Sequence, residues 1–288
     1  MSKSSFNEVR SDIDVRARRL AAVRAYGRQL MDDLLRMQRG LGVEAIHDVR
    51  VDARRLRVVL RVLQTECQPI LLQTLLFDLR DIGRALALVR EADVRRQQLA
   101  PLLNRERRIN PSAVEAAARL RLDCRQERQD LKSLIQSKNW QVRLRKLHDS
   151  VACEALLAWP RPERCFDLEH AALNSQLRNI RKDIKSGCSI KRKQLHALRI
   201  KVKKARYLCD WINELAAPVP RGLSENLKHL QTRLGELHDA LQLQQWLDKT
   251  TEFDRALCIQ LHQALRLSVT AHYRELPVWC RDKFSLDF

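Results

Sequence analysis

Glycine, proline and aromatic residues are scarce in this sequence of 288 residues. It holds 7 Gly and 8 Pro, and Phe, Trp and Tyr together make up 5%. Runs of β-branched residues are few, whereas Leu, Arg, Ala and Gln, which all favour helices, are abundant. The shortage of aromatics also argues against a protein that stacks the bases of single strands on aromatic side chains. The composition therefore predicts an all-α protein.

Several motifs are absent as well. None of the eight Cys belongs to a C-x-x-C motif, which argues against a zinc ribbon or a thioredoxin-like site. We expect most of them to be small buried side chains in a reducing compartment. No uncharged apolar run reaches the roughly 18 residues of a membrane span, and the N-terminal residues lack the apolar core of a signal peptide. We therefore expect a cytoplasmic protein that does not insert into membranes.

The chain is strongly basic. It carries 54 Lys and Arg against 35 Asp and Glu, a formal net charge of +19. A folded chain with this excess attracts anions, and it repels itself unless some of them are bound. Nucleic acid, an anionic membrane surface and polyphosphate are therefore the candidate partners.

Apolar residues recur with helical spacing through almost the whole chain. Ser11 is a suitable N-cap for the first helix, Gly40 and Gly42 end it, and Pro101 is expected to lie beyond the third helix. The Trp-Pro-Arg-Pro run at 159–162 is the clearest linker signal. The pattern predicts helices at residues 11–39, 43–67, 70–99 (this one open to an interruption), 112–136, 139–158, 167–186, 191–215, 223–249 and 252–275.

Two segments far apart in the chain repeat one basic motif. Residues 46–57 read IHDVRVDARRLR, and residues 195–206 read LHALRIKVKKAR. Five basic positions match at one constant offset: His47, Arg50, Arg54, Arg55 and Arg57 with His196, Arg199, Lys203, Lys204 and Arg206. Such a match indicates an internal duplication.

A second pair of segments supports the duplication. Residues 86–91, LALVRE, and 234–239, LGELHD, match at nearly the same offset as the basic motifs. We infer two helical half-units joined by the Pro-rich linker. The predicted boundaries are 1–158 for the first half-unit, 159–166 for the linker and 167–288 for the second half-unit.

Placed on a helix, each motif has an apolar stripe with a basic stripe beside it. The first basic stripe, spaced by three, four, three and four residues, is His47, Arg50, Arg54, Arg57 and Arg61. The apolar stripe one residue earlier is Ile46, Val49, Ala53, Leu56, Leu60 and Leu63. The second copy keeps this phase, with apolar Leu195, Leu198, Val202, Ala205, Cys209 and Ile212 beside basic His196, Arg199, Lys203 and Arg206.

Like charges are neighbours along the first basic stripe. The pairs Arg50–Arg54, Arg54–Arg57 and Arg57–Arg61 are three or four residues apart, and each costs about 0.2–0.5 kcal/mol in an isolated helix. No acid interrupts the stripe over about 21 Å of helix. Guanidinium groups donate paired hydrogen bonds to phosphate oxygens. Both motif histidines are also expected in the first turns of their helices, where N–H groups attract anions. The pattern therefore predicts a surface that binds a polyanion.

These motifs resemble those of the conserved histidine α-helical domain (CHAD) family. The family's H-x-x-R-V-x-x-R-R-x-R resembles residues 47–57, and L-H-x-x-R-x-x-x-K-(K/R)-x-R-Y resembles 195–207. Its L-G-x-x-R-D-x-D-V resembles 86–94, and L-Q-x-x-L-G-x-x-x-D resembles 230–239. The resemblance covers nearly the whole chain. It implies a single CHAD domain over 1–288, with two four-helix bundles related by a pseudo-twofold around a basic groove or pore.

The resemblance also implies inorganic polyphosphate as the ligand and association with polyphosphate granules. It implies ligand contacts at His47, Arg50, Arg54, Arg57, His196, Arg199, Lys203, Lys204 and Arg206. The repeat and the basic stripe add Arg55 and Arg61 to the predicted site. The helices after the motifs carry Arg80, Arg84, Arg90, Lys228, Arg233 and His238, of which Arg90, Lys228 and Arg233 are included in the predicted site. Some relatives carry a triphosphatase domain with an E-x-E-x-K signature, which this chain lacks.

Two other classes of function stay open beside non-catalytic polyphosphate binding. The charge permits a nucleic-acid binder, although zinc-finger, RNP and clear helix-turn-helix signatures are missing. An enzyme that transfers or hydrolyses phosphate is the other, although the chain has no Walker A sequence and no glycine-rich phosphate loop. Asp81, Glu91, Asp93 and Asp239 could bind a metal, but we expect them to pair with nearby arginines. We predict no cofactor, no catalytic residue and no metal site.

Overall fold

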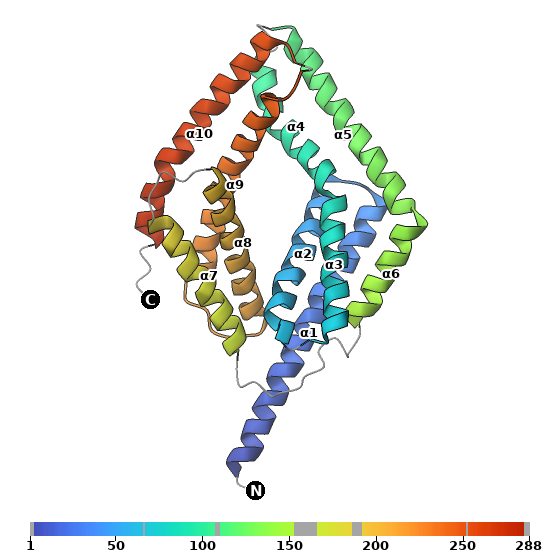
Figure 1. Ribbon diagram of the computed structural model, residues 1–288, viewed down its shortest axis with the longest axis vertical. Coiled ribbons are helices and arrows are strands. Elements are labelled where there is room, and N and C mark those ends of the chain that lie inside the picture. Colours follow the sequence, from blue (N-terminus) through green and yellow to red (C-terminus); the bar gives the residue numbers. More distant parts are fainter. Residues whose placement is uncertain are drawn as a thin grey trace. The chain divides into compact units, whose positions relative to one another are not determined.

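The part of the chain that the structure describes is helical and contains no strand. The computed structural model describes residues 3–65, 67–106, 110–152, 166–185, 192–251 and 253–284. Its helices are α1 (Lys3–Arg39), α2 (Val43–Val62), the 3₁₀ turn η1 (Leu63–Thr65), α3 (Pro69–Ala85), α4 (Ala87–Glu106), α5 (Ser112–Gln136), α6 (Lys138–Ala152), α7 (Asp167–Lys185), α8 (Arg192–Glu214), α9 (Leu223–Leu247) and α10 (Arg255–Phe284) (Figure 1). The predicted all-α fold class is confirmed.

Most helix boundaries lie within a few residues of those predicted. Gly42 is the N-cap of α2, and Pro69 begins α3, where the side chain of Gln68 accepts a hydrogen bond from the backbone N–H of Leu71 at 2.7 Å. Proline suits this position because the first helical N–H has no partner within the helix. The two outermost ends were predicted wrongly. The first helix begins at Lys3 rather than Ser11, and the last one continues to Phe284.

The predicted helix at 70–99 is two helices, and the second of them runs through Pro101. The break falls at Leu86, between α3 and α4. Pro101 lies inside α4, so its expected place beyond the helix was wrong. A proline removes one hydrogen bond from a helix interior. Leu99 and Leu103, on either side of it, are fully buried, and their packing maintains the helix.

Contacts divide the chain into two compact units that interleave along the sequence. Unit 1 comprises Met1–Arg90, Gln129–Ser175 and Tyr207–Arg221. Unit 2 comprises Glu91–Arg128, Gln176–Arg206 and Gly222–Phe288. The first motif therefore belongs to unit 1 and the second to unit 2. The consecutive half-units 1–158 and 167–288 stay a prediction, and all but the last residue of the predicted linker 159–166 lies outside the described residues.

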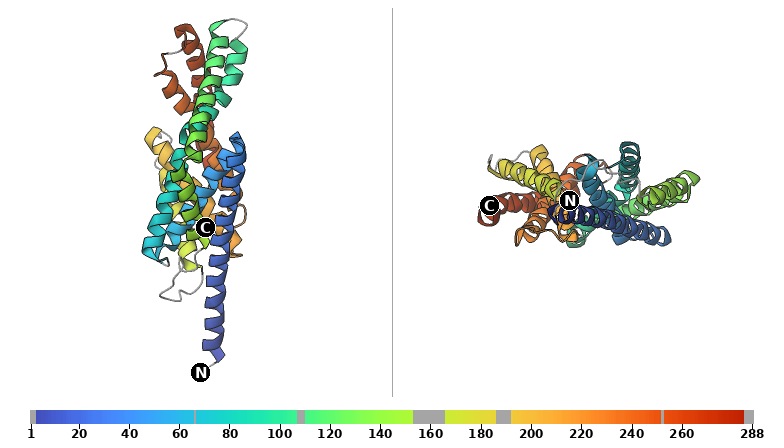
Figure 2. Two further views of the ribbon diagram at one scale, coloured as in Figure 1. Left: turned by 90° about the vertical axis from the view of Figure 1, so that its right-hand side faces the viewer. Right: turned by 90° about the horizontal axis from the view of Figure 1, so that it is seen from below.

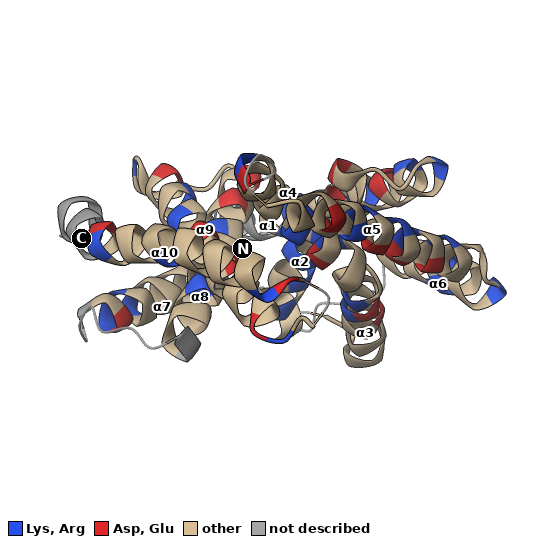
Figure 3. Cartoon of the chain, turned by 90° about the horizontal axis from the view of Figure 1, so that it is seen from above, with Lys and Arg blue, Asp and Glu red and all other residues tan. Residues whose placement is uncertain are grey.

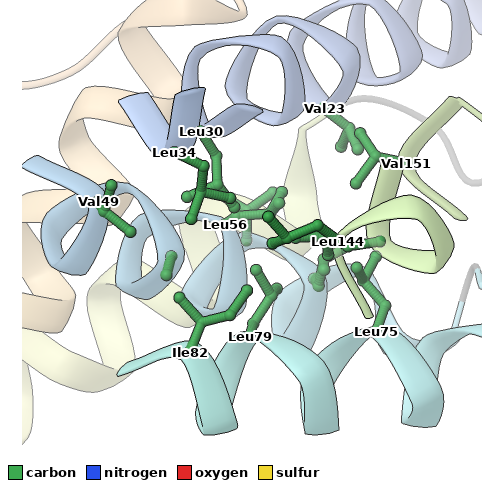
Figure 4. Close-up of a cluster of buried hydrophobic side chains, with 14 of the residues drawn as sticks. Val23, Leu30, Leu34, Val49, Leu56, Leu75, Leu79, Ile82, Leu144 and Val151 are labelled. Carbon is green, nitrogen blue, oxygen red and sulfur yellow. The ribbon is translucent and has the colours of Figure 1, made fainter. Parts of the chain in front are cut away.

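Four helices enclose the core of unit 1. α1 packs on α2 and α6, and α3 packs on the same two helices. Leucine and valine side chains from all four meet between them, among them Leu30, Leu56, Leu79 and Leu144 (Figure 4). Figure 2 shows α1 as one unbroken helix whose N-terminal turns extend beyond α2. Gly27 of α1 faces Val151 of α6 so closely that a Cβ there would overlap the valine side chain.

A buried ion pair attaches the start of α7 to α1. Nε and Nη2 of Arg19 donate to Oε1 and Oε2 of Glu169, both at 2.7 Å. The two side chains are 1% and 0% exposed. Removing either partner would leave a buried charge without compensation, so the pair fixes where α7 begins on unit 1.

Unit 2 has a separate core. Leu99 of α4, Leu120 of α5, Leu247 of α9 and Leu261 of α10 belong to one buried cluster. α9 and α10 also pack directly on each other. The N-terminal part of α8, up to Arg206, belongs to this unit and carries the second motif.

Two other expectations concern the cysteines and the membrane. Cys67, Cys124 and Cys209 are buried as expected, and Cys258 is half-buried. The side chains of Cys153, Cys165, Cys188 and Cys280 lie outside the described residues. Among the helices that the structure describes, none is both long enough and apolar enough to cross a membrane.

Candidate functional site

Both motifs form the helices that the repeat predicts, with the apolar stripe buried in each. Ile46, Val49, Ala53, Leu56, Leu60 and Leu63 of the first copy are at most 2% exposed. Leu195, Leu198, Val202, Ala205, Cys209 and Ile212 of the second are at most 1% exposed. Burial of these stripes sets the rotation of each helix and brings the neighbouring basic stripe to the edge of the core.

The motif histidines lie one residue deeper in their helices than expected. His47 is the fifth residue of α2, and His196 is the fifth residue of α8. Only the first four N–H groups of a helix lack an intrahelical partner, so the expectation of first-turn histidines was wrong. The attraction of the helix N-terminus for an anion therefore acts before these residues, and the histidines contribute through their side chains.

In unit 1, Arg57 lies in a cluster with four other arginines from α2 and α3. Burial first, and then the charges of Arg61, Arg54, Arg80 and Arg84, lower the pKa of Arg57. The Nε of Arg57 is buried and has no hydrogen-bond acceptor among the described residues. Figure 3 shows Lys and Arg in blue on α2 and α3, the helices that carry this arginine cluster. A partly desolvated guanidinium among like charges is a strong site for an anion.

Arg80 and Arg84 of α3 were left out of the predicted site. They lie four residues apart on the helix that follows the first motif helix, a spacing that puts both on one face. That spacing is a usable signal when the two helices are direct neighbours, and α3 does pack on α2. Arg80 also lies over the ring of Phe77, 5.2 Å from its centroid.

Arg50 is anchored to the backbone of α3. Its Nη1 donates to the carbonyl oxygen of Gly83 at 2.5 Å. The side chain is half-buried, and the bond fixes the start of the first basic stripe against the end of α3. Arg50 therefore has a structural contact beside its predicted role as a ligand contact.

Arg55 has surroundings unlike those of the arginine cluster. Its Nη1 lies 3.3 Å from Oδ1 of Asp52, and its Nη2 lies 3.7 Å from Oδ2 of Asp210 on α8. Its guanidinium carbon is 6.0 Å from the centroid of the Tyr207 ring. Two carboxylates therefore already face this motif residue.

In unit 2, the second motif brings two histidines together. The rings of His196 on α8 and His238 on α9 have centroids 5.0 Å apart. Burial first, and then the charges of Arg199 and Lys203, lower the pKa of His196. Nη2 of Arg199 lies 3.9 Å from Oδ1 of Asp239. This face thus combines cations with imidazoles and one acid.

The other predicted site residues are spread over the two units. Lys203, Lys204 and Arg206 are half-buried on α8 in unit 2. In the same unit, Lys228 is exposed on α9, and Nη1 of Arg233 lies 3.0 Å from Oε2 of Glu275 on α10. Arg90 of unit 1 is half-buried near the start of α4.

Three of the four acidic residues considered as metal ligands pair with arginines. Asp81 lies 3.2 Å from Arg143, Asp93 lies 2.7 Å from Arg128, and Asp239 contacts Arg199. The expected pairing is therefore confirmed for these three, while Glu91 is exposed. Among the described residues, no group of three or more His, Cys, Asp or Glu could hold a metal ion.

These features define an all-α protein with a buried apolar stripe and a basic stripe on the motif helix of each unit. A model of the CHAD domain family matches residues 19–248. The chain belongs to the CHAD domain family.

Two solved structures share the fold. PptA from Streptomyces chartreusis is 19% identical, with a TM-score of 0.72 over 92% of this chain and 99% of that one. The CHAD domain from the plant Ricinus communis is 17% identical, with a TM-score of 0.74 over 94% of this chain and 92% of that one. Comparison with curated proteins gave no match.

Proposed function

We propose that the protein binds inorganic polyphosphate through the basic stripes of α2 and α8 and catalyses no reaction on it. Membership of the CHAD family, which is linked to polyphosphate binding in general, supports this ligand. The observation that carries the proposal is the arginine cluster around Arg57, whose pKa is lowered by burial and by four neighbouring arginines. A linear polyanion with a charge at every phosphate offsets this repulsion along the whole stripe.

The two faces would contribute differently. Arg54, Arg57 and Arg61, with Arg80 and Arg84, offer only donors and positive charge. The face on α8 also offers the imidazoles of His196 and His238, which are 5.0 Å apart. A neutral imidazole donates one hydrogen bond, and a protonated one adds charge.

Titration calorimetry with long-chain polyphosphate tests the proposal. We expect saturable binding that weakens steeply with salt, by analogy with the counterion release that accompanies nucleic-acid binding. We also expect thermal unfolding to shift upwards in the presence of the ligand. Absence of both heat and thermal protection at moderate salt would refute the proposal.

A charge-reversal set locates the site. Arg54→Glu, Arg57→Glu and Arg61→Glu leave Arg50 and its bond to Gly83 intact, and we expect affinity to fall by at least about a hundredfold, since three phosphate contacts become repulsive. The control set changes the same charge at the exposed residues Arg121, Arg125 and Arg145. An equal loss in both sets would mean that only net charge matters.

Two further measurements separate the alternatives. DNA or RNA that displaces polyphosphate at equal phosphate concentration would identify a nucleic-acid binder. Phosphate released from polyphosphate with Mg²⁺ or Mn²⁺ would identify an enzyme. We expect neither result.

The repeat and the resemblance also predict that both motifs line one basic groove and are related by pseudo-twofold symmetry. If one chain occupies both motif faces, reversal of Arg54 and Arg57 or of Lys203 and Arg206 should weaken the same binding event. Two independent events, each lost with one motif, would contradict it. We also propose association with polyphosphate granules, tested by whether a fluorescent fusion follows them and the charge-reversed protein does not.

A further inference from the structure

Arg55 of the first motif contacts carboxylates on two helices. Asp52, one turn earlier on α2, lies 3.3 Å away, and Asp210 of α8 lies 3.7 Å away. The ring of Tyr207, itself buried, lies beneath the guanidinium at 6.0 Å. These contacts come from the side of α2 that faces α1 and the end of α8, all within unit 1.

Asp52 faces a second buried carboxyl group, that of Asp33, where α1 packs on α2. Asp52 is 8% exposed and Asp33 is 4% exposed. A carboxylate can only accept hydrogen bonds, so a bond between two carboxyl groups requires one of them to hold a proton. Two carboxyl groups buried together in the α1–α2 contact therefore favour sharing one proton.

Acids outnumber bases in this seam. Nη2 of Arg36 lies 2.7 Å from Asp33 and 2.6 Å from Asp48, and Gln29 donates to Asp33 at 3.2 Å. The ionisable groups that face one another from the three helices are Tyr26, Asp33 and Arg36 of α1, Asp48, Asp52 and Arg55 of α2, and Tyr207, Asp210 and Glu214 of α8. Even if the pair Asp33 and Asp52 holds one proton, the remaining carboxylates carry more charge than the two guanidinium groups. A phosphate chain that approached Arg55 would meet this excess of negative charge.

We propose that Arg55 is a positioning residue that sets α2 against α1 and the end of α8, and that the proton shared by Asp33 and Asp52 makes this contact sensitive to pH. The part of this proposal that concerns polyphosphate rests on the proposed function, whereas the shared proton does not.

The direction of the pH effect follows from the aspartate pair. Burial first, and then the hydrogen bond with Asp33, raise the pKa of Asp52 from 3.8 to about 7, against the opposing charge of Arg55. The folded chain thus holds a proton that the unfolded chain has lost above about pH 4. The stability that Asp52 contributes is greatest below about pH 4, falls as the pH rises to about 7, and no longer changes above it.

Unfolding by urea at pH 5 to 8 tests the shared proton without any ligand. In the pH range where folding takes up one whole proton, the folding equilibrium constant of the unaltered protein should fall about tenfold for each unit that the pH rises. Asp52→Asn and Asp33→Asn should each remove most of this slope. Asp48→Asn, which changes an exposed aspartate of the same seam, should retain it. A slope that Asp52→Asn leaves unchanged would overturn the shared proton.

The pH dependence of stability distinguishes the proposed role of Arg55 from simple packing. Its charge lowers the pKa of Asp52, so Arg55→Gln should extend the falling part of the stability profile to higher pH. Arg55→Lys should bring the profile back towards that of the unaltered protein. An identical pH profile in Arg55→Gln would show that Arg55 does not act through Asp52.

Affinity for long-chain polyphosphate, measured where both variants are fully folded, separates positioning from ligand contact. Arg55→Gln should stay within about threefold of the unaltered protein, since carboxylates already occupy this guanidinium, whereas Arg57→Gln should lose about tenfold or more. An equal loss in both would identify Arg55 as a ligand contact and overturn its positioning role. If the unaltered protein binds no polyphosphate, the proposed function fails while the pH profiles still decide the shared proton.

Discussion

Arg55 and Arg57 lie two residues apart on α2 but in opposite electrostatic surroundings. Asp52 and Asp210 face Arg55, whereas four arginines surround Arg57 and lower its pKa. Residues two apart on a helix point about 200° away from each other, at 3.6 residues per turn. One motif therefore combines an arginine that carboxylates already face with an arginine that is crowded by like charges.

Arg57→Gln should weaken polyphosphate binding and stabilise the unliganded protein. The affinity should fall about tenfold or more, because a guanidinium that lies among four others is lost. The midpoint of urea unfolding should rise slightly, because the change relieves repulsion with Arg54, Arg61, Arg80 and Arg84. Calorimetry and urea unfolding check the two effects together. A lower midpoint would mean that Arg57 stabilises the fold and that its crowding is compensated.

Polyphosphate binding should tighten as pH falls, through His196. Burial and the nearby Arg199 and Lys203 hold its pKa below the ordinary value of 6.5, so the imidazole is neutral at pH 7 in the unliganded protein. A bound anion favours the charged form and raises that pKa. Binding therefore takes up a proton, and affinity rises as pH falls through the pKa of the bound state, by at most about tenfold per pH unit.

His196→Gln should flatten this profile between pH 8 and 5.5 in calorimetry with long chains. His229→Gln is the matched control, since His229 is exposed on α9 and lies 3.4 Å from Glu225. Profiles that stay parallel in all three proteins would exclude His196 as the group that takes up the proton.

Breaking the buried Arg19–Glu169 pair should destabilise unit 1 strongly. Arg19→Met leaves a carboxylate that is 0% exposed without its partner, a change that costs about 3–5 kcal/mol in comparable pairs. Combining it with Glu169→Leu should recover much of the loss, because both buried charges are then gone. The exposed pair Arg119–Asp123, at 3.3 Å, is the comparison, and Arg119→Met should cost less than about 1 kcal/mol. Equal losses in urea unfolding for the two single changes would be inconsistent with the burial of Arg19.

Helical periodicity predicted most of the fold and the orientation of both motif helices. The apolar stripes of Ile46 and Leu195 are buried as the spacing required, because burial of apolar surface decides how an amphipathic helix rotates. Contacts between helices were harder to predict from the sequence. The pattern placed Arg55 with the ligand residues, but Asp210 lies on a helix more than 150 positions later in the chain.

The same limit applies to Asp33 and Asp52. Asp33 lies outside the motifs and Asp52 is not one of the matched basic positions, and the packing of α1 on α2 brings the two residues together. Pro101 illustrates a different limit, since local propensity predicted a helix end where burial of Leu99 and Leu103 maintains the helix. Sequence therefore predicts which face of a helix is basic better than it predicts which charges on that face are already paired.

Asp239→Asn should strengthen polyphosphate binding by the α8 face. Oδ1 of Asp239 lies 3.9 Å from Nη2 of Arg199, so a phosphate must compete with this carboxylate for the guanidinium and is also repelled by it. Replacing the acid by an amide removes the competing charge and keeps a similar shape. We expect affinity to rise about threefold to tenfold, measured by calorimetry at moderate salt. Asp183→Asn is the control, because Asp183 pairs with Lys201 at 2.7 Å, a lysine outside the basic stripe, and it should leave the affinity within about twofold. Weaker binding after Asp239→Asn would mean that the carboxylate orients Arg199 for the ligand instead of competing for it.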